Sequence, residues 1–284
     1  LHLSLRRQRQ MCIRDRVGGP YFDMTVKFWA ELLSKAPLDL KKYEEPLFID
    51  EVGFVKDAGR ALKILCDNGV NIIASGSGAF DKKENIHGFL VGRVTRLTLY
   101  PLDFDEFVMW RNPELYQWYK EMKDRFWKSF LDEEGEISEL LEVDELKIYY
   151  DEYLKYGGYP SVVLSDQKEQ MIRDIIDAQL EKDLFQFFDI REKEKFRDAI
   201  QKIAYNSGGP LKIGSLGVSY QTAWTYLSCL SSEYIIHLLR PFYTNPLLEL
   251  RKKRKVYFHD LGVANYLSGG RLSIGQLREN FVFI

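Results

Sequence analysis

The chain has 284 residues, and its 40 Lys and Arg side chains against 42 Asp and Glu give a formal net charge of −2. Hydrophobic residues make up 45% and charged residues 29%, which excludes disordered, collagen-like and fibrous proteins and predicts one to three globular domains. Charge interrupts every apolar run well before the roughly 18 residues that a membrane-spanning helix needs, so we expect no membrane partner.

The first 16 residues show neither helical nor strand periodicity and contain five arginines with one aspartate. The run from Arg6 to Asp15 is similar to one reading frame of a transposon-based sequencing adapter, and we expect residues 1–16 to be non-native sequence. On that interpretation the natural protein begins upstream of Val17, and the remaining 35 basic and 41 acidic residues carry a net charge of −6. The alternative is a basic arm that binds nucleic acid.

The three cysteines, Cys12, Cys66 and Cys229, have no paired spacing, so the sequence predicts neither a disulfide framework nor a zinc knuckle. A reducing, cytoplasmic setting fits this composition best. The histidines His87, His237 and His259 are too scattered for a zinc site.

From Tyr21 to Tyr100, short apolar runs alternate with helical periods, which is typical of parallel strands joined by crossover helices. This half of the chain therefore predicts an α/β fold, in which Asn68-Gly69 ends a helix in a left-handed conformation. The expected elements are a strand end at residues 21–24, a strand at 46–50, a helix at 57–66, a buried strand at 70–74 and a strand at 93–100.

Residues 103–206 have helical spacing, which predicts several short helices. From Lys195 to His259 the expected order is helix, short helix, helix, strand, basic turn and strand, which is the order of a winged-helix domain. Within it, residues 218–227 predict a recognition helix capped by Ser219, with Ala223, Tyr226, Leu227 and Leu230 facing inward.

The outward positions of that helix and the basic turn are candidate DNA contacts. Five consecutive cations occupy residues 251–255, where a wing meets phosphates in a salt-dependent complex. A solvated hairpin or a protein contact would give the same pattern. The predicted DNA-binding residues are Ser219, Tyr220, Gln221, Thr225, Arg251, Lys252, Lys253 and Arg254.

Asp50 and Glu51 follow the apolar run Pro46–Ile49, so two carboxylates stand at the carboxyl end of a predicted strand, where open α/β sheets bind ligands. In phosphoryl transfer the first acid organises the magnesium shell, through water in our assignment, and the second orients or activates the attacking water. Ser75 or Ser77, after the next strand, could sense a γ-phosphate or position water. Arg93 is a candidate for stabilising transition-state charge.

The ordered segments LFIDEV, IIASGSGAF and GFLVGRVTRLTLYPLDFDEF, with later ones such as GVSYQTAWTYLSCL and KVYFHDLGVANYL, resemble predicted prokaryotic ATPases of the AAA+ superfamily. The resemblance covers nearly all of residues 21–284. It implies that Asp50 and Glu51 are a Walker B pair, that Ser75 or Ser77 is a sensor, and that Arg93 is a sensor or trans-acting arginine. It also implies a winged helix and a C-terminal restriction-endonuclease-like domain, on whose first helix Glu279 would lie.

The sequence departs from that family in one respect, since it contains no G-x-x-x-x-G-K-[ST] phosphate loop (Walker A). We therefore expect an incomplete P-loop NTPase-like α/β core, an α-helical lid region and a winged-helix domain, in a fragment truncated at both ends. The expected domains are a partial AAA core at residues 17–110, the lid at 111–191, the winged helix at 192–259 and the start of the nuclease-like domain at 260–284.

The predicted function is ATP binding with Mg²⁺, in which hydrolysis drives a conformational change in the intact parent while this chain alone is inactive. The alternative is a non-enzymatic DNA-binding or adaptor protein built around the winged helix. Neither prediction fixes the oligomeric state, so self-association remains open.

Overall fold

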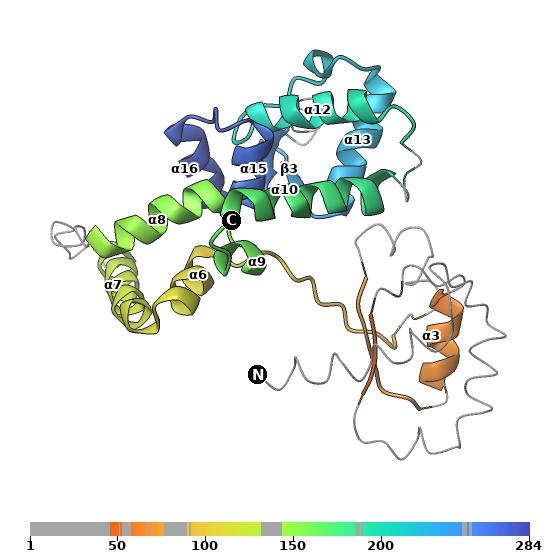
Figure 1. Cartoon of the computed structure of the whole chain (residues 1–284), viewed down its shortest axis with the longest axis horizontal. Helices are drawn as coiled ribbons and strands as arrows, with labels where there is room; N and C mark the ends of the chain where they lie inside the picture. Colours follow the sequence, from red (N-terminus) through yellow and green to blue (C-terminus); the bar gives the residue numbers. More distant parts are fainter. Residues whose placement is uncertain are drawn as a thin grey trace. The chain divides into compact units, whose positions relative to one another are not determined.

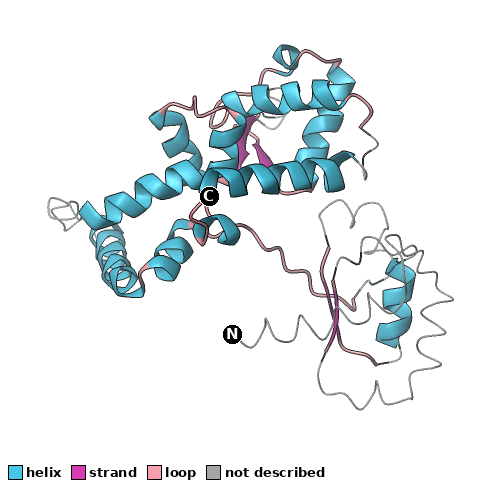
Figure 2. Ribbon diagram, in the orientation of Figure 1, coloured by secondary structure: helices cyan, strands magenta, loops and turns pink. Residues whose placement is uncertain are grey.

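The computed structural model describes residues 46–50, 52, 58–67, 69–76, 90, 92–131, 144–185, 188, 190–245, 249 and 252–284. The chain divides into two compact units, Leu1–Arg96 and Leu97–Ile284. Figure 1 shows the helices and strands of both, and Figure 2 shows that helices dominate the second unit. The predicted strand end at residues 21–24 lies outside the described residues.

The first unit contains a two-stranded parallel sheet of β1 (Leu47–Ile49) and β2 (Ile72–Ala74), joined by the crossover helix α3 (Ala58–Asp67). This confirms the predicted strand, helix and strand. The helix forms because its apolar residues recur at helical spacing and pack as one stripe, which buries Ala58, Ala61, Leu62 and Leu65. Gly69 follows with φ +79°, the left-handed conformation that the sequence predicts after this helix.

The burial predicted for β2 is wrong, because Ile73 is 52% exposed. A parallel strand becomes fully buried only when layers cover both faces of its sheet. Among the described elements of this unit, α3 is the helix that packs on the sheet, through Leu65 and its neighbours.

The strand predicted at residues 93–100 is also wrong. Arg93 lies in a turn with Gly92, and residues 94–100 belong to neither a helix nor a strand. Leu97 and Leu99 are 89% and 97% exposed. The alternating pattern supplies β-propensity, but a strand also needs a hydrogen-bonded neighbour, and no strand in the described part of the chain pairs with this segment.

The second unit begins with a helical region. Asp103 caps α6 through a capping box with Glu106, and the sequence therefore fixes this start.

The boundary between the two units lies after Arg96, whereas the sequence places a domain boundary after residue 110. The helices are α6 (Phe104–Arg111), α7 (Pro113–Leu131), α8 (Asp144–Tyr156), α9 (Pro160–Val163) and α10 (Lys168–Ala178), which continues as a π-helical turn, η4 (Gln179–Leu184).

The following elements have the predicted order of helix, short helix, helix, strand and strand. They are α12 (Lys193–Tyr205), the 3₁₀ turn η5 (Ile213–Leu216), α13 (Tyr220–Ser232), β3 (Ile236–Leu239) and β4 (Lys255–Phe258). The two strands pair antiparallel, with Ile236 opposite Phe258. Residues 207–210 lie along β4 as well, because Ser207 and Pro210 form isolated bridges to Val256 and Lys255.

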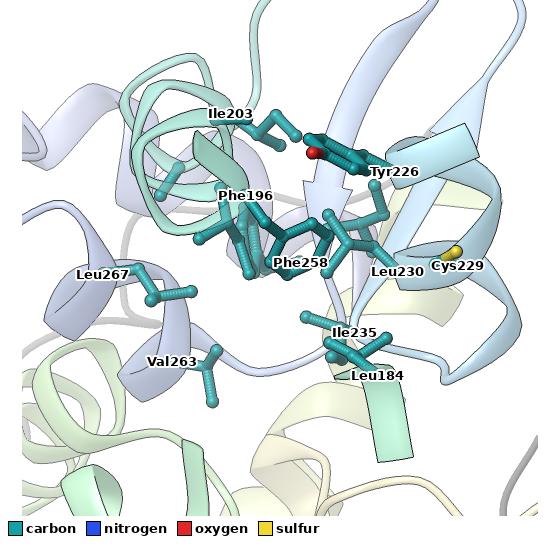
Figure 3. Close-up of a cluster of buried hydrophobic side chains, with 14 of the residues drawn as sticks. Leu184, Phe196, Ile203, Tyr226, Cys229, Leu230, Ile235, Phe258, Val263 and Leu267 are labelled. Carbon is teal, nitrogen blue, oxygen red and sulfur yellow. The ribbon is translucent and has the colours of Figure 1, made fainter. Parts of the chain in front are cut away.

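One hydrophobic core joins the helical region to these elements. Leu184 of η4 is buried with Phe196 of α12, Leu230 of α13 and Phe258 of β4, as the close-up in Figure 3 shows. Further members come from α9, from α10 and from α15 (Leu261–Leu267). The helices α9, α10 and η4 and the elements after them therefore share one core rather than forming separate cores.

Residues 260–284 pack into the same unit. Asp260 caps α15 by accepting a hydrogen bond from Val263 N at 2.8 Å, and it also accepts one from Gly158 N at 2.7 Å. Gly158 is required there, because a Cβ atom would lie 2.0 Å from the carbonyl oxygen of Leu102.

The last helix, α16 (Ile274–Phe283), is fixed to β4 by the buried side chain of Asn280. Its amide donates to Phe258 O at 2.7 Å and accepts from Phe258 N at 2.8 Å. It also accepts from Ser207 Oγ at 2.7 Å. The start of a nuclease-like domain in this region stays a prediction. Among the described residues, none of the helices has the length and apolar character needed to cross a bilayer.

Candidate functional site

The carboxyl ends of β1 and β2 bring Asp50 and Ser75 together. The parallel register pairs Ile49 with Ala74, so the next residue of each strand leaves the sheet at the same edge. Ser75 Oγ donates a hydrogen bond to Asp50 Oδ1 at 2.5 Å, and both residues are exposed. The sequence predicts that such side chains meet, and the structure brings these two together.

The backbone around this pair is held by continuation of the strand ladder. Ser75 N donates to Ile49 O at 2.9 Å, and Val52 N donates to Ser75 O at 2.9 Å. Val52 is also buried in the core beneath α3. The carboxylate and the hydroxyl therefore stand on a fixed backbone while facing solvent.

Of the other predicted catalytic residues, the structure describes Arg93, which does not contact Asp50 or Ser75. Glu51 and Ser77 lie outside the described residues. Arg93 pairs with Asp67 at the end of α3, with 3.0 Å between Nε and Oδ1. Because a crossover helix returns the chain to the amino ends of the strands, Asp67 belongs to the edge opposite Asp50, and Arg93 with it.

An oxygen donor set of carboxylate and hydroxyl suits Mg²⁺, which keeps several waters and binds one or two carboxylates together with substrate phosphates. Asp50 and Ser75 fit that chemistry. In the segments that the structure describes, no group of three or more His, Cys, Asp and Glu side chains could hold a metal ion by itself.

Comparison with known families bears on this edge directly. Residues 21–108 match the family described as an AAA domain. This match, which includes β1, α3 and β2, supports an AAA-like ATPase domain with a P-loop NTPase-like fold. Residues 147–273 match a second family, described as a domain of unknown function (DUF8612).

The curated relatives carry no described activity. An uncharacterized protein of Methanocaldococcus jannaschii is 26% identical over 265 residues, which is 89% of this chain and 55% of the relative. An uncharacterized protein of Haemophilus influenzae is 25% identical over 249 residues, which is 83% of this chain and 56% of the relative. The chain thus spans about half the length of these relatives. No solved structure matches it.

The second predicted site lies on α13. Ser219 caps the helix, with its Oγ accepting from Thr222 N at 3.1 Å, which confirms the predicted cap. The predicted inward residues of this helix are buried, and Tyr220, Gln221 and Thr225 are exposed as expected. Tyr220 is 69% exposed.

The basic segment after β3 lies beside α13. The guanidinium of Arg254 stands 5.2 Å from the ring centroid of Trp224, and Lys252 Nζ stands 5.6 Å from that of Tyr243. Lys252 and Lys253 are exposed, whereas Arg251 lies outside the described residues. Trp224 and Tyr243 are not among the contacts predicted from the sequence, although Tyr220 and Trp224 are one helical turn apart, a spacing that places both on one face of the helix.

Lys255, the fifth cation of the run, is engaged elsewhere. Its Nζ lies 2.7 Å from Glu279 Oε1, and Tyr257 OH donates to the same oxygen at 2.9 Å. The hydrogen bond from Lys255 lowers the pKa of the Glu279 carboxyl. Glu279 thus contacts its neighbours, and Lys255 forms an ion pair with it.

Proposed function

We propose that this chain carries the acidic half of an AAA-type ATP site and that the whole protein hydrolyses ATP. The observation that carries the proposal is the Ser75–Asp50 hydrogen bond at the carboxyl edge of a parallel strand pair, within the segment that matches the AAA family. Ligands of open α/β sheets bind at such edges.

The proposed roles follow from the chemistry of each side chain. Asp50 holds Mg²⁺ through water, and the ion supplies neutralisation of the charge that develops on the phosphate oxygens. Glu51 orients the attacking water and accepts its proton. Ser75, or Ser77, contacts the γ-phosphate or positions the same water. Arg93 is assigned a role in trans, because its pairing with Asp67 directs it away from Asp50.

The sequence contains no G-x-x-x-x-G-K-[ST] loop, whose backbone amides and lysine hold the phosphates in this fold. We therefore expect this chain alone to bind MgATP weakly and to show no turnover. In the whole protein, hydrolysis biases the helical and winged-helix parts between two arrangements.

The test joins the strand and phosphate loop of an AAA domain upstream of Tyr21 and measures phosphate release and binding of a fluorescent ATP analogue. Glu51→Gln should keep nucleotide binding and lower turnover by at least about 100-fold, the usual effect of losing a general base. Glu114→Gln on α7 is the matched control and should change neither quantity. Unchanged turnover in Glu51→Gln would refute the Walker B assignment.

A second candidate function is DNA binding by residues 192–259 acting as a winged helix. It is supported by the order of α12, η5, α13, β3 and β4, and by the contact of Arg254 with Trp224, which ties the basic segment to the face of α13. The contacts assigned to DNA are the exposed α13 residues Ser219, Tyr220, Gln221 and Thr225 together with the cations from Arg251 to Arg254.

Fluorescence anisotropy with a labelled duplex tests this second function. Replacing Lys252, Lys253 and Arg254 by Ala should weaken binding and flatten the dependence of affinity on salt, because fewer counterions are released. Affinity that ATP does not alter would favour a separate binding module. If the unsubstituted protein and the triple Ala variant show the same dependence of affinity on salt, the assignment of these cations to DNA binding is rejected.

A further inference from the structure

The basic segment between β3 and β4 combines charge with exposed aromatic rings. From Arg240 to Arg254 it contains five cations and one carboxylate, Glu249, in a chain whose net charge is −2. The segment also holds Phe242, which is 89% exposed, and Tyr243, which is 37% exposed. Such positive charge predicts an anionic partner, and the exposed rings predict that the partner has flat apolar faces.

The rings and cations are in contact with one another. On α13, Tyr220 and Trp224 meet edge to face with ring centroids 6.2 Å apart, and the guanidinium of Arg254 lies over the ring of Trp224. Lys252 in turn lies over the ring of Tyr243. Because Lys252 and Arg254 are two residues apart, their Cα atoms are at most about 7 Å apart. Tyr220, Trp224, Arg254, Lys252 and Tyr243 thus form one surface, which we name the aromatic–cation surface, and the exposed Phe242 adjoins it in sequence beside Tyr243.

A DNA duplex does not explain the exposed rings. The faces of paired bases are covered by the neighbouring pairs, and proteins reach only base edges in the grooves. Unpaired bases offer their faces, on which aromatic side chains and guanidinium planes stack. Cations beside those rings hold the phosphates that connect successive bases.

We propose that the aromatic–cation surface binds single-stranded nucleic acid, with bases stacked on Phe242 and Tyr220 and phosphates held by Lys252, Lys253 and Arg254. This inference rests on the second function proposed above and narrows its substrate class. The contact with the ring of Trp224 holds the Arg254 guanidinium at this surface. DNA and RNA share the chemistry of unpaired bases on a phosphate chain.

The experiment titrates the full chain into fluorescein-labelled oligo(dT), oligo(U) and a mixed-sequence duplex of equal length, at the same salt concentration. Single strands should bind about tenfold more tightly than the duplex, and Phe242→Ala should weaken single-strand binding about tenfold, the effect of losing one stacked base. The same variant should leave duplex affinity within about twofold, because phosphate contacts remain.

Three further variants test whether loss of a stacking ring, and not a change in folding, causes the loss of affinity. Phe242→Trp should restore single-strand affinity, and Tyr220→Ala should reduce it as Phe242→Ala does. Trp110→Ala removes a half-exposed ring from α6, away from this surface in sequence, and should change nothing. Comparing the affinities for oligo(dT) and oligo(U) then shows whether the surface prefers DNA or RNA, because contacts to the 2′-hydroxyl raise the affinity for RNA alone.

The outcomes distinguish this proposal from the function on which it rests. Duplex binding at least as tight as single-strand binding, with no effect of Phe242→Ala, overturns the single-strand proposal and leaves DNA binding intact. Absence of binding to any oligonucleotide overturns both. Displacement of oligo(dT) by polyglutamate at equal charge concentration also overturns it, because the surface would then be selecting an acidic protein partner.

Discussion

Asn280 is the side chain whose loss should most clearly destabilise the second unit. Phe258 lies opposite Ile236 in the antiparallel pair, and the next residue, His259, donates its N–H to Ile235 O at 3.1 Å. Because backbone groups of successive residues in a strand point to opposite sides, the N–H and C=O of Phe258 point away from β3. The amide of Asn280 satisfies both groups and accepts from Ser207 Oγ, as a neighbouring strand would. Asn280 is 1% exposed, so water reaches none of these groups freely.

The cost of removing it follows from those three hydrogen bonds. Each buried polar group left without a partner costs about 1–3 kcal/mol, and water entering the vacated space recovers part of this. We expect Asn280→Ala to lower the free energy of unfolding by about 3 kcal/mol, a large share of the roughly 5–15 kcal/mol of a typical domain. Urea unfolding followed by circular dichroism measures the change.

Two controls make the result specific. Asn265→Ala removes an exposed amide that donates to Lys155 O at 3.2 Å, and should cost less than about 1 kcal/mol. In Asn280→Ala, the amide hydrogen of Phe258 should also exchange with solvent faster than those of α13. A loss below about 0.5 kcal/mol, with unchanged exchange at Phe258, would refute this account of how α16 is held.

Three other substitutions have outcomes that the structure specifies. Burial raises the pKa of Asp260 to about 6 from 3.8, so the stability that this group adds is complete below pH 4 and is lost as pH rises through 6. We compare the free energy of unfolding of the unsubstituted protein with that of Asp260→Asn by urea titration. The difference between the two should fall by about 3 kcal/mol from pH 4 to pH 7. A difference that does not change with pH would contradict this role of Asp260. Gly158→Ala should lower the melting temperature by several degrees, at a cost above about 2 kcal/mol, because its Cβ would meet Leu102 O; an unchanged melting temperature would show that the turn can shift. Arg93→Ala should cost less than about 1 kcal/mol in urea unfolding, since both partners of its ion pair are nearly half exposed.

Local patterns predicted much of this fold. The Ser219 cap and the periodicity of α13 gave its start and its buried face, and the apolar runs gave β1 and β2. The meeting of Asp50 with Ser75 was also predictable, because parallel strands end at a common edge. These features depend on residues close in sequence or on a general rule of sheet geometry.

Contacts between distant residues could not be predicted in this way. Arg254 reaches Trp224 across 30 positions, and Asp260 reaches the Gly158 amide across 102. The strand predicted at residues 93–100 does not form. The alternation of apolar and polar residues describes that segment alone and does not say whether a second strand pairs with it. The exposure of Phe242 likewise depends on how the segment between β3 and β4 lies, which its local composition does not determine.

The core shared by η4, α12, α13 and β4 determines how this protein can be dissected. A shortened protein that starts near residue 192 would lose Leu184 and the apolar residues of α9 and α10 from beneath α12 and α15. Such a protein would expose the apolar faces of α12 and α15 and aggregate. A shortened protein that starts at the junction between Arg96 and Leu97 would keep the core whole. A protease should accordingly release a fragment that begins close to Leu97, and insertions or deletions between residues 160 and 267 should accumulate in connecting segments and not in these helices.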